Sequence, residues 1–321
     1  MKYLAKYKQG RQSFALETPA VITAWASIAG KKEVEGPLSH TFDIKCRDTY
    51  FGQKTWEQAE KHMQQTVLKK LITKAGIEPS DVGLVFSGDL LNQCIGSSFS
   101  LRNTGLPHLG LYGACSTMAE SLCIGAMLVD GGYLRHAVCT ASSHFCTAER
   151  QYRFPLGYGG QRTPTSQWTV TGSGAVLVCS KGSGLRIESC TMGTVRELGV
   201  KDANNMGAAM APSALATIRS HFEDTKSSPE DYDLIVTGDL GKLGSEMLLE
   251  LAEKDGLDFK GRLTDCGILV FDAEKQDVHA GGSGCGCAAS VLTSAILPKV
   301  VSGEYENILF MATGALMSPT S

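Results

Sequence analysis

The chain has 321 residues, of which 43% are hydrophobic and 20% charged, and its 30 basic side chains nearly balance 33 acidic ones. This composition excludes an intrinsically disordered chain, and the formal charge of −3 gives no electrostatic case for binding nucleic acid or an anionic membrane surface. No stretch reaches the roughly 18 apolar residues of a membrane span. Eleven cysteines without zinc-type spacing or an export signal indicate reduced thiols in a soluble intracellular protein.

The first half of the chain predicts a helix, a strand, a second helix and another strand. Residues 58–75 form an amphipathic pattern that ends at Gly76, which is typical of a surface helix. Residues 81–90 (DVGLVFSGDL) predict a buried parallel strand. Residues 116–129 are apolar on nearly all faces, as in a helix buried in the middle of a molecule, and residues 136–141 predict the next strand.

The second half repeats this order. Residues 231–240 (DYDLIVTGDL) match the first strand at an offset of 150, with helices predicted at 211–221 and 245–254. The turn ending at Cys287 and the strand 308–313 match the turn at Cys115 and its following strand at an offset of 172. Such an internal duplication is more specific than the similarity common to all α/β proteins.

Two such halves predict a layered α/β protein in which two similar helices lie between two sheets, a five-layer αβαβα arrangement. We expect a first half over residues 1–190 and a second over residues 191–321. Residues 81–142 and 231–314 are expected to superpose and to bring Cys115 near Cys287. Between residues 147 and 167 the sequence has no periodicity, which predicts a long functional or mobile loop.

Cys115 is the first candidate for chemistry. It lies in a turn between Gly113 and Ser116 at the start of the buried helix, where the helix dipole and unpaired amides would lower the pKa of a thiol. It is either a nucleophile or a small residue that allows tight packing. His144 follows the end of a strand. It is either the base that activates Cys115 or an ordinary hydrogen-bonded loop residue. The glycines of HAGGSGCGCAAS (279–290) indicate close backbone approach, to a ligand or to a facing helix.

Three segments resemble sequences of the thiolase / 3-oxoacyl-acyl-carrier-protein synthase superfamily. They are GACSTMAES around Cys115, GGSGCGCAAS around Cys285 and ATGALMSPT near residue 321. More narrowly, blocks in matching order from about residue 10 to 321 resemble the stage V sporulation protein AD family of spore-forming bacteria. The superfamily resemblance implies a thiolase fold, usually dimeric, with Cys115 at the position of the acyl-accepting nucleophile.

The synthases of this superfamily also use a His and a second His or Asn from loops of the second half. Here the corresponding loops offer Asp239 and Lys242 in TGDLGKLG, and Ser283 or Cys285 in GGSGCGC. Because general acid–base help is worth about 10²–10⁴-fold in rate, these replacements argue against acyl transfer. The resemblance therefore implies that Cys115 keeps the nucleophile's position without being catalytic.

The family resemblance implies that the chain binds dipicolinic acid (pyridine-2,6-dicarboxylate), as the anion or as its calcium chelate, and supports its uptake into the developing spore. Helix-terminal amides, cationic donors and a flat apolar wall would suit such a planar dianion. The expected ligand-binding residues are drawn from both halves: Cys115, His144, Arg150, Met206, Gly282, Ser283 and Cys285. Arg153 and Phe145 are further candidates, and neither a metal site nor a cofactor is expected.

Three functions remain open at this point: a dipicolinate-binding protein, an active acyltransferase or thioesterase using Cys115 with His144, and a purely structural subunit of a membrane channel. The resemblance implies other spore-membrane proteins of the same operon as partners, at the cytoplasmic face of the spore inner membrane. We also expect a homodimer that pairs through strand 136–141. The second half lacks a counterpart of the first-half strand 171–179, so its sheet should keep one exposed edge.

Overall fold

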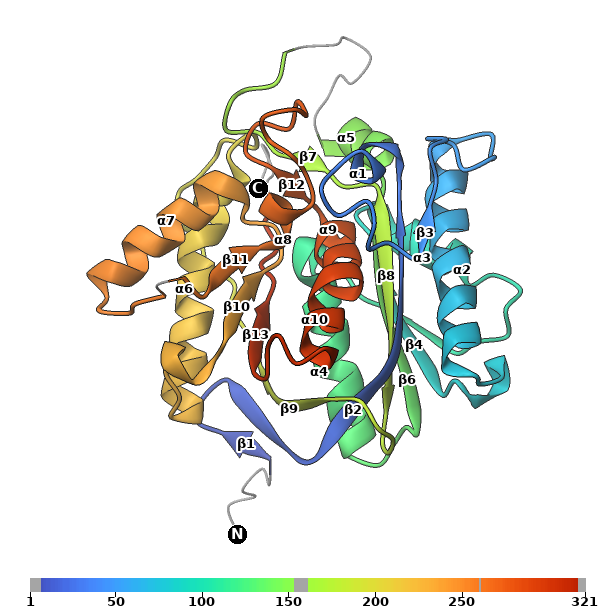
Figure 1. Ribbon diagram of the computed structural model, residues 1–321, viewed down its shortest axis with the longest axis horizontal. Helices are drawn as coiled ribbons and strands as arrows, with labels where there is room; N and C mark the ends of the chain where they lie inside the picture. Colours follow the sequence, from blue (N-terminus) through green and yellow to red (C-terminus); the bar gives the residue numbers. More distant parts are fainter. Residues whose placement is uncertain (1–6, 153–160, 260, 317–321) are drawn as a thin grey trace.

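The computed structural model describes residues 7–152, 161–259 and 261–316. Figure 1 shows two sheets with a pair of helices between them and further helices on their outer faces. The layers follow the order helix, sheet, helix, sheet, helix, so the predicted five-layer αβαβα arrangement is confirmed.

The first sheet has the strand order β1-β2-β8-β6-β4-β5, and β3 and β9 also pair with β2. Its pairs β4–β5 and β4–β6 are parallel, whereas β6–β8 and β2–β8 are antiparallel. The strands are β1 (Lys8–Gln9), β2 (Ser13–Ala29), β3 (Ile44–Lys45), β4 (Leu84–Gly88), β5 (His108–Gly110), β6 (His136–Ser143), β8 (Gly172–Cys179) and β9 (Leu185–Thr191).

The second sheet is smaller and wholly parallel, in the order β11-β10-β13. Its strands are β10 (Leu234–Thr237), β11 (Leu263–Asp265) and β13 (Ile308–Met311). A two-residue ladder between β7 (Trp168–Thr169) and β12 (Gly282–Ser283) joins the loops of the two halves.

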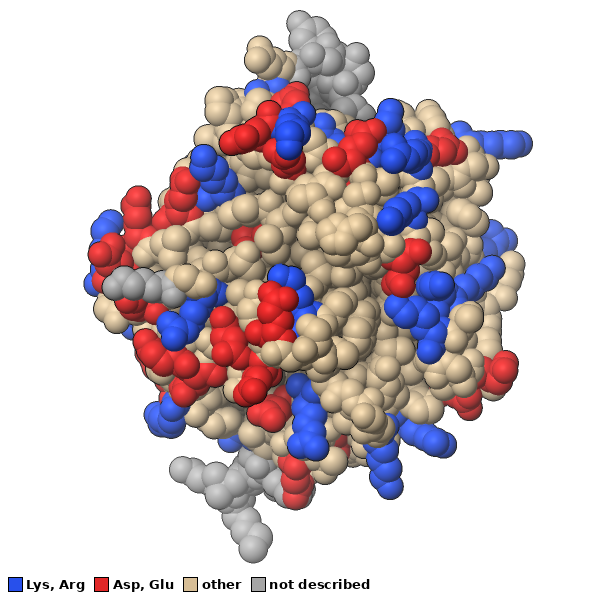
Figure 2. All heavy atoms as spheres, viewed as in Figure 1, with Lys and Arg blue, Asp and Glu red and all other residues tan. Residues whose placement is uncertain are grey.

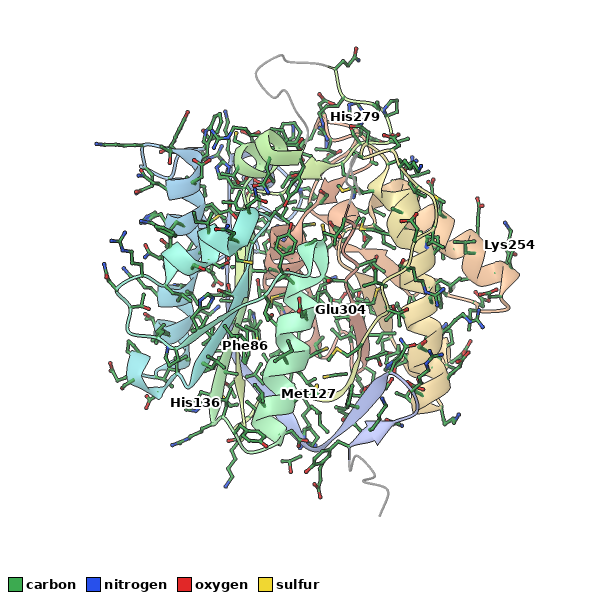
Figure 3. The ribbon with its side chains drawn as sticks, turned by 180° about the vertical axis from the view of Figure 1, so that it is seen from behind. Phe86, Met127, His136, Lys254, His279 and Glu304 are labelled. Atoms are coloured by element: carbon green, nitrogen blue, oxygen red, sulfur yellow. The ribbon has the colours of Figure 1, made fainter. Side chains whose placement is uncertain are left out.

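Two helical segments fill the central layer. One is α4 (Thr117–Asp130), and the other begins as α9 (Cys285–Val291), passes through a π-helical turn (Leu292–Ile296) and ends as α10 (Leu297–Val301). Every residue of α9 is buried, because the first sheet, α4 and α8 pack around it. Figure 3 shows Phe86 of β4 between the first sheet and α4, and its ring is fully buried there.

Outer helices cover the two sheets. The first sheet is covered by α2 (Trp56–Ala75) and α3 (Ile95–Ser100), and the second by α6 (Met206–Thr225) and α7 (Gly241–Lys254). Shorter helices lie near the ends of the strands: α1 (Lys31–Val34), α5 (Phe145–Tyr152) and α8 (Cys266–Leu269). Figure 2 shows acidic and basic side chains intermingled around a broad uncharged area over the central helices.

The internal duplication is visible in the order and pairing of the elements. α6 begins and ends 150 residues after α2, and each helix is followed by a 3₁₀ turn with a capping box, Pro79–Asp81 and Pro229–Asp231. β10 begins 150 residues after β4, and β13 begins 172 residues after β6. Most of the extra residues of the second half lie between β11 and α9, where they form α8 and β12.

Several expectations need correction. Residues 136–141 belong to β6, which is hydrogen-bonded to β4 on one side and β8 on the other, so the predicted dimer contact through this strand is wrong. Among the described residues, β5 is one edge of this sheet, since it pairs only with β4. The long strand β2 was not predicted, and the expected loop 147–167 begins inside α5.

The second sheet has an open edge, as expected. In the described part of the chain no strand pairs with the side of β13 that faces away from β10. Its first three residues are half-buried, whereas β6 is buried from Ala137 onward because β8 covers it. The division of the chain at residue 190 stays a prediction. None of the helices in residues 7–152, 161–259 and 261–316 is both long and apolar enough to cross a bilayer.

Candidate functional site

Cys115 lies in a 3₁₀ turn, Ala114–Ser116, that leads directly into α4. The turn is held by short local bonds, since Ser116 Oγ donates to the Gly113 carbonyl at 2.7 Å and Thr117 Oγ1 donates to the Ala114 carbonyl at 2.8 Å. Ala114 has φ of +51°, a left-handed conformation that costs a non-glycine residue about 1–2 kcal/mol. This turn directs Cys115 into the interior, where only 5% of its surface is exposed.

Asp239 faces Cys115 from the second half of the chain. It follows β10, is 1% exposed, and its Oδ2 accepts a hydrogen bond from the Gly284 amide at 2.7 Å. The other oxygen, Oδ1, has no hydrogen-bond partner of normal geometry among the described residues, although the weakly donating Cys115 thiol lies beside the carboxyl group. Burial, reinforced by the charge of nearby Asp265, raises the pKa of Asp239 to about 7.

The same surroundings keep the Cys115 thiol neutral. Burial, the charge of Asp239 and the neighbouring Cys285 raise the pKa of Cys115 well above its ordinary value. The helix terminus was expected to lower this pKa, but its effect of roughly 0.3–1 kcal/mol is smaller than the cost of burying a thiolate beside a carboxylate. The turn therefore resembles that of a nucleophile in shape but holds an unreactive thiol.

The glycine-rich turn of the second half packs against the first sheet. Cys285 Sγ donates to the Ser142 carbonyl at 3.0 Å, and a Cβ on Gly286 would lie 2.4 Å from the Gly172 carbonyl oxygen. Gly284 has φ of +101°, which turns its amide toward Asp239. Close approach to a facing strand thus explains part of the glycine series. By pseudo-symmetry Cys115 was expected near Cys287, and the two thiols are close enough to interact electrostatically. Cys285, which opens α9, also neighbours Cys115.

Two tyrosines form the outer boundary of this region. The hydroxyl groups of Tyr112 and Tyr152 are 2.7 Å apart, and Tyr152 also donates to the Leu90 carbonyl. Both rings are nearly half exposed, and both hydroxyl groups interact electrostatically with Cys115 and Cys285. We define the thiol–carboxyl site as Cys115, Asp239, Gly284 and Cys285, closed by the pair Tyr112–Tyr152. Sequence reasoning missed the tyrosines, although Tyr112 directly precedes the GACS turn.

His144 does not reach the thiol–carboxyl site. It is 2% exposed, its Nε2 donates to the Thr49 carbonyl at 2.8 Å, and its Nδ1 accepts from the Cys146 amide at 3.2 Å. Burial lowers the pKa of His144, so it is a neutral, fully bonded side chain. The structure therefore forms no Cys115–His144 pair.

Two other predicted ligand contacts also lie elsewhere. Arg150 forms an ion pair with Glu57 and lies over the Trp56 ring, with 5.5 Å from guanidinium carbon to ring centroid. Met206 packs with the apolar core between α6 and the second sheet. Gly282 and Ser283 are buried in β12 beside Asp239, close to Cys285.

The further candidate Phe145 is not at the site either, and neither is His279, which begins the glycine-rich segment 279–290. Phe145 stacks on Trp168 with ring centroids 3.8 Å apart, and Arg153 lies outside the described residues. His279, which Figure 3 shows at the end of the molecule near α5, pairs with Asp277 at 3.3 Å.

A cavity of about 1140 Å³ adjoins the turn that carries Cys115. Tyr112, Gly113 and Ser116 line one end of it, and the rest runs between β9, α6 and the open edge of β13. Small molecules have room to approach the start of α4 from this side. Within the described ranges no cluster of three or more His, Cys, Asp or Glu side chains has a geometry that could hold a metal ion.

Comparison with known proteins agrees with this geometry. The model of the family described as stage V sporulation protein AD (SpoVAD) matches residues 10–321. The chain is 40% identical over 311 residues to stage V sporulation protein AD of Bacillus subtilis (strain 168). The matched region covers 97% of the chain and 92% of that protein.

Solved structures show the same fold at low sequence identity. Acetamide-bound OleA of Xanthomonas campestris has a TM-score of 0.60 at 14% identity, covering 94% of this chain and 97% of OleA. The 3-oxoacyl-[acyl-carrier-protein] synthase III of Aquifex aeolicus VF5 has a TM-score of 0.53 at 13% identity, covering 92% of this chain and 96% of the synthase. These likenesses establish the thiolase-like fold.

Proposed function

The chain belongs to the stage V sporulation protein AD family, and from this premise we propose that it binds dipicolinic acid and supports the uptake of that acid into the developing spore. Its role is binding on a thiolase-like fold that has lost the chemistry of acyl transfer.

One observation supports binding over catalysis most strongly: Cys115 faces Asp239 and not a histidine. A thiol becomes a nucleophile when a base or a positive environment favours its thiolate. Here burial and the carboxyl group favour the protonated thiol, and His144 is bonded elsewhere. Cys115, at the position of the nucleophile in the synthases, can therefore contact a ligand without reacting with it.

We place the ligand between the Cys115 turn and the Gly284–Cys285 turn, beneath Tyr112 and Tyr152. The positive end of the α4 dipole lies at the Cys115 turn and favours a carboxylate there. Cys115, Ser283 and Cys285 keep their proposed roles as contacts of this region. His144, Arg150 and Met206 lose theirs, since their side chains are engaged elsewhere.

A calorimetric titration with dipicolinate tests this function. Isophthalate is the matched control, because it has the same two carboxylates on a planar ring but lacks the ring nitrogen. We expect saturable binding of dipicolinate and binding of isophthalate at least tenfold weaker. Absence of binding, or equal affinity for both, would overturn the proposal.

An acyltransferase or thioesterase is the second candidate function, because Cys115 keeps the nucleophile's turn at the start of α4. Incubation with an acyl thioester followed by intact-mass measurement separates the two functions. A covalent acyl group on Cys115 would favour the enzyme, whereas an unchanged mass together with dipicolinate binding supports the binding protein.

We further propose a peripheral position at the cytoplasmic face of the spore inner membrane, with membrane proteins of the same operon as partners and the calcium chelate as a second form of the ligand. A homodimer would form through the β5 edge of the first sheet. Three large apolar side chains, Ile95, Phe99 and Leu109, are 42–47% exposed on α3 and β5 at this edge. Exposed apolar strand edges of this kind favour association with a second copy.

A further inference from the structure

The thiol–carboxyl site collects acidic groups around Asp239 without a cation. Cys115 faces it from the turn before α4, Asp265 and Cys266 from β11 and α8, and Cys285 and Cys287 from α9. No Lys, Arg or His within residues 7–152, 161–259 and 261–316 forms an ion pair with Asp239. An anionic ligand that enters this site therefore needs a neutral donor.

Asp239 has one oxygen that can become that donor. Its Oδ2 already accepts from the Gly284 amide, whereas Oδ1 is buried and has no partner of normal hydrogen-bond geometry. A buried acceptor left without a partner costs about 1–3 kcal/mol, and more when it is charged. A proton on Oδ1 removes the charge and converts this oxygen from an unsatisfied acceptor into a donor.

The equivalent aspartate of the first half shows that this arrangement is particular to Asp239. Asp89 lies 150 residues earlier in the same GDL motif, and its two oxygens accept from the Leu91 amide at 2.8 Å and the Ser97 amide at 2.6 Å. Both oxygens of Asp89 are thus used by the fold. Of these two aspartates, Asp239 alone keeps an oxygen available, and its carboxyl group lies beside both cysteine-bearing turns.

We propose that Asp239 determines the specificity of the ligand site by donating a hydrogen bond from a protonated Oδ1 to one carboxylate of dipicolinate. This inference rests on the proposed function. It assigns to Asp239 the contact that a cationic side chain was expected to make, and it makes binding depend on one proton.

The pKa of Asp239, which burial raises to about 7, sets the range in which this dependence appears. A bound carboxylate would raise this pKa further, because a second negative charge disfavours the ionised form. Below pH 7 the carboxyl group is already protonated and affinity is constant. Above pH 7 binding takes up a proton, so the dissociation constant rises by up to about tenfold per pH unit.

The test is a calorimetric titration of dipicolinate into the full chain at pH 6, 7, 8 and 9. For the wild type we expect binding at pH 9 to be at least tenfold weaker than at pH 6, with close to one proton taken up per ligand at pH 8. In the Asp239→Asn variant the amide is a permanent donor, so its dissociation constant should vary less than threefold over this range. The exposed Asp277→Asn is the matched control and should follow the wild type.

Each outcome decides the proposal. A wild-type affinity that does not change with pH, or an Asp239→Asn protein that keeps the wild-type pH dependence, would overturn it. If Asp239→Asn fails to fold, proton uptake by the wild type still decides, since its absence at pH 8 contradicts a protonated donor. Failure to bind dipicolinate at every pH would instead reject the proposed function.

Discussion

At the scale of single residues, burial is the strongest influence on the ionisable groups of the site. Cys115 stands at a helix N-terminus, which favours an anion by roughly 0.3–1 kcal/mol, yet the pKa of its thiol is raised well above the ordinary value. The protein interior and Asp239 oppose the thiolate together. The chain thus keeps the thiol protonated at neutral pH.

Slow alkylation of Cys115 is the expected consequence. Iodoacetamide reacts with thiolates, so at pH 8 we expect Cys115 to react at least tenfold more slowly than the more accessible Cys46, because Cys115 is buried and protonated. Peptide mass spectrometry of timed samples measures both rates in one protein. Equal rates at the two cysteines would show that Cys115 is an accessible, activated thiol.

The sequence pattern predicted the position of Cys115, but the predicted lowering of its thiol pKa was wrong. The GACS turn at the start of an apolar segment was sufficient to place the cysteine at a helix terminus. Its partner lies 124 residues later, and the TGDLGKLG segment offered both Asp239 and Lys242. Which of the two faces the thiol depends on how the two halves pack. The folded chain also hydrogen-bonds His144 to Thr49 and pairs Arg150 with Glu57, and the sequence did not predict either contact.

At the scale of secondary structure, a buried carboxyl group fixes α2 on the first sheet. Glu60 of α2 is 1% exposed and accepts hydrogen bonds from Thr147 Oγ1 at 2.6 Å and Ser142 Oγ at 3.2 Å. Burial and the nearby charge of Asp89 raise the pKa of Glu60 to about 8. The folded protein therefore binds a proton that the unfolded chain releases near pH 4.5.

This difference predicts how stability changes with pH. Below pH 4.5 both states hold the proton, and between pH 4.5 and about 8 only the folded state does. The free energy of unfolding should therefore fall as pH rises through this range, by at most about 1.4 kcal/mol per pH unit from this group.

Glu60→Gln removes the titrating group while keeping the shape of the side chain. Urea unfolding of the variant should show a fall between pH 5 and 8 that is smaller than the wild-type fall by about 1 kcal/mol or more. The exposed Glu230→Gln should match the wild type. An unchanged pH dependence in Glu60→Gln would mean that Glu60 is ionised in the folded protein.

Strand positions were predicted better than strand neighbours. The apolar runs located β4, β6, β8 and β10 to within a few residues. The expectation that residues 136–141 form an edge failed because hydrophobicity does not distinguish an exposed edge from a strand paired on both sides. β2 was missed because its alternation is interrupted by a register shift between Ile22 and Ala24.

At the scale of the whole molecule, the duplication explains the layers. Each half contributes an outer helix, a parallel βαβ unit and one central helix, and the two central helices cover each other between the sheets. The repeat offsets of 150 and 172 were readable in the sequence and correspond to the observed starts of α6, β10 and β13. The contacts between the halves, which create the thiol–carboxyl site, were not readable.

The free edge at β5 predicts the oligomeric state. Wild-type protein should be a dimer by light scattering at micromolar concentration, and Leu109→Glu should make it a monomer, since a charge on an edge strand disfavours pairing with another strand. Tyr133→Glu, at a position 79% exposed in the turn between α4 and β6, is the control and should leave the dimer intact. A monomeric wild type, or a dimer that survives Leu109→Glu, would contradict this assignment.

We have proposed that dipicolinate binds between the two cysteine-bearing turns without covalent chemistry at Cys115. The most direct measurement is a dipicolinate titration of Cys115→Phe beside Cys115→Ala, with circular dichroism to establish that both are folded. Because a phenyl ring would fill the site whereas a methyl group would not, we expect no binding by Cys115→Phe and less than tenfold weakening by Cys115→Ala. A folded Cys115→Phe protein that binds dipicolinate with wild-type affinity would place the ligand elsewhere and contradict the claim.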